Sequence, residues 1–368
     1  MWAGFAAYLV ALWQAPRLGR RPVWGLILAL VTGFAVAPVL LSHDVYSYVA
    51  YARLGVRHGL DPYVHAPLAA PDDPVYADVT WTEASSAYGP LFTLLTYPLA
   101  WLPVGVAVAT LKAVAALSVL GIAALTARIA AWRGIDPLRA AAFVALNPLV
   151  LVHVVAGAHN DALTMLLAML GVAAVLSRRE LAGGAALVAA IATKLSAAVL
   201  APFALVATAT PPPTGRKPIH VSGFRPVGRL LLGALGAALL VGAGAYLAFG
   251  WDWLGGFGLA GEDQSRTSHM SIPIVVARIA GLDPDGVRLA AVVLFAALVL
   301  YLLAWTWRGG DWVRGAAWAS FGLLLATAWL LPWYLIWPLP LAAISRDRML
   351  QLLTLALTAY QLGARIPL

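Results

Sequence analysis

Uncharged, mostly apolar segments long enough to cross a bilayer recur along the whole 368-residue sequence, and they constrain its fold more than any other feature. Residues 23–41 alone form such a run of 19 residues. Only 11% of the residues are charged, whereas soluble domains carry about 25%. Backbone groups in lipid must bond to one another, which here favours helices. We therefore expect one all-α, polytopic integral membrane domain over residues 1–368.

Composition excludes several kinds of site. The sequence has no cysteine, which rules out disulfides, thiolate metal sites and cysteine nucleophiles. The net charge of +8 does not indicate nucleic acid, because the basic residues lie in short loops between apolar segments. The adjacent Asp72 and Asp73 are no D-x-D metal pair, so we expect neither a metal nor a cofactor. Residues 1–14 lack a basic start and are expected to form a helix, not a cleaved signal peptide.

Loop charges predict the orientation of the chain. Arg17, Arg20 and Arg21 place the first loop in the cytoplasm, so a first extracytoplasmic loop spans residues 42–103 and a second spans residues 250–285. Residues 91–102 are too short to cross and are expected to lie as a helix at the outer surface. Crossing helices are expected at residues 104–132, 137–156, 161–176, 230–249 and 287–307.

Two apolar blocks are expected to turn back inside the membrane. Residues 181–208 form one block, yet the loop that follows is basic and should be cytoplasmic. A single crossing would put that loop outside, so we expect two half-depth helices that turn near Lys194. Broken helices of this kind occur where they line an enclosed cavity. A second break is expected at Pro332, between residues 315–331 and 333–344.

The polar residues on the predicted outer side allow two interpretations. Asp44 follows the first outward helix, where desolvation of a carboxylate is costly and indicates a function, although it could simply cap a helix at residues 45–56. Asn160 or Asp161 could likewise cap the next helix, and Lys194 could snorkel to the interface. The simplest interpretation of four tryptophans is an interfacial aromatic belt: Trp251, Trp253, Trp333 and Trp337.

One strong acid, several histidines and intramembrane cations at an outer membrane face suit glycosyl transfer from a lipid-linked phosphosugar. The leaving group is a phosphate, which needs positive charge and no general acid. Only the acceptor hydroxyl requires a base, so one carboxylate suffices, in contrast to the carboxylate pair of a glycosidase.

Four motifs in order carry a resemblance: HDVYSY at residues 43–48, GLDPY at 59–63, NPL at 147–149 and GAHNDAL at 157–163. They resemble the GT-C membrane glycosyltransferases and, more narrowly, the polyprenol-phosphomannose-dependent α-1,6-mannosyltransferases of actinobacterial lipomannan assembly. The resemblance implies a GT-C-type multi-helix bundle in the cytoplasmic membrane, with juxtamembrane helices in the first outer loop. It also implies an inverting transfer, most simply of mannose, from a polyprenyl-phosphate donor to a glycan or glycolipid acceptor at the outer face.

These arguments yield a set of candidate site residues. The predicted catalytic base is Asp44. The predicted cations at the donor phosphate and lipid are Lys194, Arg266, Lys112 and His269. The predicted substrate contacts are His43, Tyr48, Asp61, Tyr63, Tyr88, His159, Asn160 and Asp161, where His159 rests on the resemblance alone.

A different class of protein remains as the alternative. A transporter or flippase of lipid-linked cell-envelope intermediates also uses intramembrane cations such as Lys112 and Lys194, and broken helices. Transporters often consist of repeated halves, and the sequence holds no second copy of the HDVYSY or GAHNDAL segments.

Overall fold

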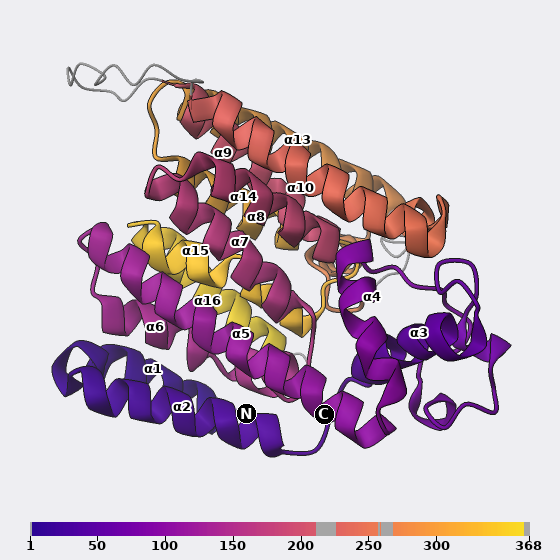
Figure 1. Cartoon of the computed structure of the whole chain (residues 1–368). Coiled ribbons are helices and arrows are strands. Elements are labelled where there is room, and N and C mark those ends of the chain that lie inside the picture. Colours follow the sequence, from indigo (N-terminus) through magenta and orange to yellow (C-terminus); the bar gives the residue numbers. More distant parts are fainter. Residues whose placement is uncertain (1, 211–225, 257, 259–267, 364–368) are drawn as a thin grey trace.

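The computed structural model describes residues 2–210, 226–256, 258 and 268–363, and this part of the chain is a bundle of helices without strands (Figure 1), as predicted. The α-helices are α1 Trp2–Leu18, α2 Arg20–Val36, α3 Asp44–His58, α4 Pro90–Thr96, α5 Val104–Trp132, α6 Pro137–Ala145, α7 Asp161–Leu176, α8 Glu180–Thr193, α9 Ala201–Ala209, α10 Pro226–Phe249, α12 Ile272–Ala280, α13 Pro284–Trp307, α14 Trp312–Ala326, α15 Leu339–Ile344 and α16 Arg348–Gly363. Short 3-10 or π segments include η3 Tyr97–Trp101, η4 Val150–Val155, η5 Leu195–Leu200 and η8 Pro332–Ile336.

Three of the described helices, α5, α10 and α13, are long and apolar enough to cross a membrane on their own. The expected bounds of α5 and α7 are confirmed to the residue. Helices α8 and α10 pack closely because each offers a glycine to the other's backbone. A Cβ on Gly184 would lie 2.0 Å from the Leu230 carbonyl oxygen, and one on Gly233 would lie 1.9 Å from that of Leu181. Small residues at such contacts let helix backbones approach in lipid.

Helix α2 ends five residues earlier than expected. Pro38 disfavours the helical conformation for the residue before it, and Ala37 is extended, with φ −61° and ψ 160°. The carbonyls exposed by this ending are bound by Lys112 of α5, whose ammonium donates to Ala37 and, at 3.3 Å, to Pro38. The Lys112 charge therefore completes the end of α2, and this contact gives no support to the prediction that Lys112 binds the donor.

The chain turns back at Lys194, as expected. Helix α8 begins against α10 and ends where the Gly89 amide of the outer loop donates to the Thr193 carbonyl at 3.2 Å. Lys194 is extended, with φ −158° and ψ 129°, and η5 with α9 returns toward the end where Phe203 packs against Gly315. The break expected at Pro332 is also present, between α14 and η8.

The first outer segment folds onto α3 and α4. A buried carboxylate fixes it: Asp73 accepts from Arg53 Nε at 2.7 Å and lies 2.8 Å from His58 Nε2. Residues 81–88 of this segment reach back toward the start of α3. The expected surface helix at 91–102 is present as α4 and η3.

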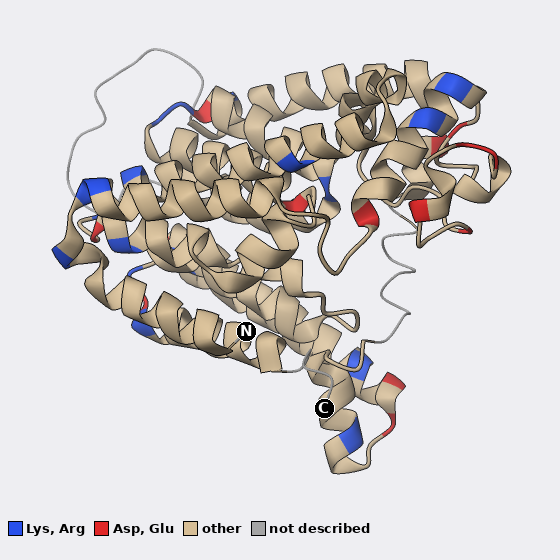
Figure 2. Cartoon of the chain, turned by 90° about the horizontal axis from the view of Figure 1, so that it is seen from below, with Lys and Arg blue, Asp and Glu red and all other residues tan. Residues whose placement is uncertain are grey.

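Charged residues of opposite sign gather at opposite ends of the bundle: Figure 2 shows most basic residues at one end and most acidic residues at the other. At the basic end the Arg133 guanidinium binds the Ile344 carbonyl and pairs with Asp311. Arg314 pairs with Asp347 at 2.7 Å. Asp311 and Asp347 of this end are thus paired with arginines.

Candidate active site

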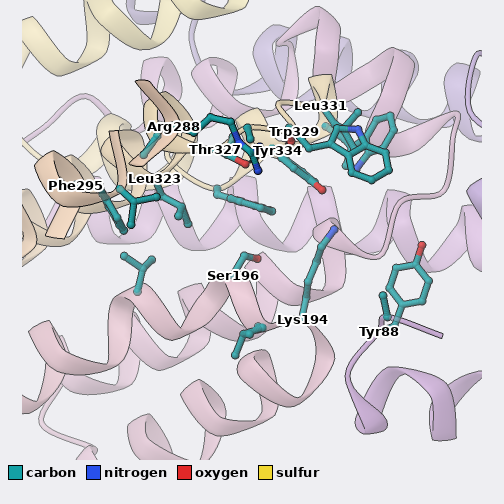
Figure 3. Close-up of a pocket in the computed structure, with 18 of the residues that line it drawn as sticks. Tyr88, Lys194, Ser196, Arg288, Phe295, Leu323, Thr327, Trp329, Leu331 and Tyr334 are labelled. Atoms are coloured by element: carbon teal, nitrogen blue, oxygen red, sulfur yellow. Dashed lines mark hydrogen bonds between the residues drawn. The ribbon is translucent and has the colours of Figure 1, made fainter. Parts of the chain in front are cut away.

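A cavity of about 890 Å³ opens between the outer segment, the turn at Lys194, helix α13 and residues 327–337 (Figure 3). Its polar end is lined by Asp44, Tyr51, Trp81, Ser85, Tyr88 and Trp329. Its apolar limb runs along α13, α9 and α14 and is lined by Val199, Pro202, Leu289, Val292, Phe295, Val299 and Leu323. Lys194, Tyr334 and Trp337 lie on the wall between them, and Figure 3 shows the Lys194 side chain extending into the space toward Tyr334.

Asp44 stands at the first turn of α3 with only 15% of its side chain exposed. Its Oδ1 accepts from Trp81 Nε1 at 3.1 Å, and its Oδ2 lies 3.7 Å from His159 Nδ1. Burial raises the pKa of Asp44, although the Trp81 hydrogen bond and the charge of Lys194 oppose that rise. The N-cap position of α3 is held by His43 without a side-chain cap bond. The capping interpretation of Asp44 is therefore wrong.

Lys194 forms a buried ion pair with Asp161. Its Nζ lies 2.9 and 2.8 Å from the two carboxylate oxygens of Asp161, whose side chain is 0% exposed. Trp337 Nε1 donates to the same carboxylate at 2.6 Å, and the rings of Tyr334 and Trp337 face the ammonium at 4.9 and 5.7 Å. The snorkelling interpretation of Lys194 is wrong, and so is the capping interpretation of Asp161.

His159 and Asn160 lie behind Asp44 in the turn before α7. The His159 ring stacks on Trp333, with centroids 3.8 Å apart and planes inclined by 18°, and burial lowers its pKa. Within the described part of the chain, its nitrogens and the side-chain amide of Asn160 have no hydrogen-bond partner. Asn160 occupies the N-cap position of α7 without forming a side-chain cap bond. Because Trp333 and Trp337 are each only 7% exposed, the belt interpretation is wrong for both.

The remaining predicted substrate contacts divide into one lining residue and several supports. Tyr88 lines the cavity, and the buried Tyr48 packs edge-on against it at 4.8 Å. Tyr63 donates to the Tyr88 carbonyl at 3.0 Å, while Asp61 accepts from the Tyr63 amide in a tight turn. His43 is exposed beside α3. Tyr48, Tyr63, Asp61 and His43 are not among the lining residues, and their contact with substrate stays a prediction.

The predicted cations are only partly brought together. Lys194 lines the cavity, His269 instead bonds to Arg278 at 3.1 Å and does not line it, and Arg266 lies outside the described residues. Sequence reasoning missed Arg288, which lines the cavity from the first turns of α13. It pairs at 2.8 Å with Asp285, whose side chain is 82% exposed. The sequence did contain a signal for it, since Arg288 is a basic residue near the start of the helix that begins at Pro284.

The desolvated carboxylate of Asp44 and the paired ammonium of Lys194 thus line one cavity, which continues along the apolar side chains of α13. In the described ranges, no group of three His, Asp or Glu residues is placed to hold a metal ion. The chemistry available to these side chains is therefore proton acceptance by Asp44 and charge stabilisation by Lys194 and Arg288.

Comparison with known proteins identifies relatives. The family described as "Alpha-(1->6)-mannopyranosyltransferase, N-terminal domain" matches residues 1–210. The α-(1→6)-mannopyranosyltransferase A of Mycobacterium tuberculosis is 31% identical over 376 residues, which cover 93% of this chain and 70% of that protein. The enzyme of the same name from Corynebacterium glutamicum is 29% identical over 191 residues, which cover 50% of this chain and 38% of the relative.

Proposed function

The chain belongs to the α-(1→6)-mannopyranosyltransferase family and is a mannosyltransferase; from this premise we propose its donor, mechanism and location. The donor is mannose linked to a polyprenyl phosphate, and the acceptor is a hydroxyl of a glycan or glycolipid. The transfer inverts the anomeric centre and takes place at the outer face of the cytoplasmic membrane.

One observation carries this proposal: Asp44 and Lys194 line the same cavity, whose other limb is apolar. The exposed leucines and valines of α13 border that limb and would face lipid. A polyprenyl chain can lie along such a surface while its phosphate meets the charged wall. A water-soluble nucleotide sugar has no long apolar part that could fill the apolar limb.

The proton step follows from the environment of Asp44. Its raised pKa makes the carboxylate a better base toward an acceptor hydroxyl. As Asp44 takes the proton, the hydroxyl oxygen attacks C1 of the mannose, and the C1–O bond breaks with its electron pair passing to the phosphate. A single displacement inverts the configuration, so an α-linked product requires a β-linked donor. No second carboxylate is needed.

The leaving phosphate gains charge as the bond breaks, and fixed cations stabilise it. An ammonium has three N–H donors, and the two oxygens of Asp161 engage at most two of those of Lys194. The third can reach a phosphate in the cavity. Arg288 supplies a second cation, because it lines the same cavity from the first turns of α13.

The location rests on the distribution of charge. Most basic residues gather at the end of the bundle opposite α3, the helix whose first turn holds Asp44 (Figures 1 and 2). Cytoplasmic loops of membrane proteins carry such an excess of basic residues. The site is accordingly assigned to the extracytoplasmic side, where polyprenyl donors replace nucleotide sugars.

The test is transfer from radiolabelled polyprenyl-phosphomannose to a short mannoside by the Asp44→Asn variant. Asparagine keeps the shape and can still accept from Trp81, so the protein should fold. Loss of a general base should lower kcat about 10²- to 10⁴-fold. The matched control is Asp61→Asn, in a turn that does not line the cavity and that asparagine can also form. Retention of more than a tenth of wild-type transfer by Asp44→Asn would contradict the mechanism.

A further inference from the structure

Two indole rings meet at the end of the cavity where Asp44 lies. Trp81 comes from the outer segment and Trp329 from the connection between α14 and η8, and both line the cavity. Their centroids are 5.8 Å apart and their planes are inclined by 67°. Trp81 is 37% exposed. Two large aromatic rings from distant parts of the sequence thus form one accessible surface beside the proposed base.

We propose that Trp81 and Trp329 form the acceptor subsite and bind the terminal hexopyranose ring of a carbohydrate acceptor. The inference rests on the proposed function and adds the acceptor's place to it. A pyranose has apolar C–H faces and a polar edge of hydroxyls. Indole rings suit such a ligand because they combine a large apolar surface with a polar N–H group.

The position of Trp81 matches the bond that is formed. Its Nε1 lies 3.1 Å from Asp44 Oδ1, so a sugar packed on this indole lies next to the carboxylate. An α-(1→6) linkage is made through the C6 hydroxyl, which projects one carbon beyond the ring. The ring can therefore rest on the indoles while the hydroxyl alone reaches Asp44.

The polar groups around the indoles also suit a sugar. Tyr51 lines this end, and its hydroxyl donates to the Ala84 carbonyl at 2.9 Å. The Ser85 side chain lines the same wall. The other limb, along α13, offers aliphatic side chains such as Leu289 and Val292, which would leave sugar hydroxyls without partners.

Trp81 additionally acts as a positioning residue for Asp44. Its N–H fixes one carboxylate oxygen, and the segment that carries it is fixed to α3 by the buried pair of Arg53 and Asp73. Trp329 contributes an aromatic face to the same surface through its ring contact with Trp81. Trp81 and Trp329 should therefore respond differently to substitution.

The experiment is steady-state kinetics with polyprenyl-phosphomannose and a soluble α-mannoside. Trp329→Ala should raise the acceptor KM about tenfold, the effect of one good aromatic contact, and leave the donor KM unchanged. Trp81→Phe keeps most of the ring but loses the N–H, so kcat should fall and the acid limb of the pH profile should move upward. The control is Trp132→Ala, another exposed tryptophan, on the last turn of α5 at the basic end.

An unchanged acceptor KM in Trp329→Ala, or an equal rise of both KM values, would overturn the proposal. If that variant folds poorly, Trp329→Phe should show a smaller rise in the acceptor KM, and no rise would again overturn it.

A second measurement needs no donor and separates this proposal from the proposed function. Saturation-transfer NMR from tryptophan ring protons to a 6-deoxymannoside, which lacks the reacting hydroxyl, should detect binding to the wild-type protein and a clear loss in Trp329→Phe. Failure of polyprenyl-phosphomannose as donor would leave this signal intact. An absent signal, or one that the substitution leaves unchanged, would refute the subsite.

Discussion

Removing the charge of Asp161 should lower the stability of the protein strongly, because its carboxylate is fully buried and paired with Lys194. Asp161→Asn preserves the shape of the side chain, but it leaves the Lys194 ammonium, whose side chain is 18% exposed, without a counter-charge. Both carboxylate oxygens now bond to Lys194 at 2.9 and 2.8 Å, and Oδ1 also accepts from Trp337. The pair joins the start of α7, the turn after α8 and the segment before α15.

The size of the effect follows from burial. Breaking a buried ion pair by removing one partner costs about 3–5 kcal/mol, because the other charge stays buried and unpaired. At roughly 2 °C per kcal/mol for a large domain, the melting temperature in detergent should fall by about 6–10 °C. The control is Asp311→Asn, which loses the pair between Arg133 and the 34% exposed Asp311 side chain but keeps the cap on α14. Because the lost carboxylate is more exposed than Asp161, this change should cost less, about 1 kcal/mol.

A double-mutant cycle separates stability from catalysis. Lys194→Met alone strands the buried carboxylate of Asp161 and should be as costly as Asp161→Asn. The double variant removes both charges, so it should be more stable than either single variant while transfer remains lost. A melting temperature of Asp161→Asn within 2 °C of wild type, or costs that simply add in the double variant, would refute the argument.

Further predictions concern the base, the second lysine and the orientation. Burial raises the pKa of Asp44, and only the ionised carboxylate accepts a proton. As the pH is lowered, kcat/KM should therefore begin to fall at a pH above the ordinary carboxyl pKa of about 4. A fall that begins only at or below that pKa would contradict this. Lys112→Met should leave the carbonyls of Ala37 and Pro38 at the end of α2 without their donor and cost about 1–3 kcal/mol, measured by thermal unfolding, with the donor KM unchanged. A raised donor KM at full stability would instead place Lys112 at the donor site. Since the chain has no cysteine, Ser85→Cys should react with an impermeant maleimide on intact cells and Ser177→Cys should not, and the reverse would invert the assigned orientation.

Sequence alone was enough for those features that depend on local properties of the chain. The length and apolarity of α5 and α7 decided their bounds, because in lipid an uninterrupted apolar run has helix as its available structure. The charge of the loop after α9 required the chain to turn back near Lys194, and Pro332 marked the second break. The early end of α2 also had a local signal in Pro38, which the long apolar run of residues 23–41 concealed.

The roles of the polar side chains were decided by tertiary structure. Lys112 and Lys194 lie in similar apolar surroundings in the sequence, yet one binds the carbonyls that end α2 and the other pairs with Asp161 at the cavity. Trp337 looks like an interfacial residue until it meets Asp161, which is 176 positions away along the chain. Inside a membrane each polar group must find its partner within the protein, and packing determines which partner lies within 3 Å. Local sequence therefore predicts that a buried charge has a specific role, and only the folded bundle shows whether that role is structural or catalytic.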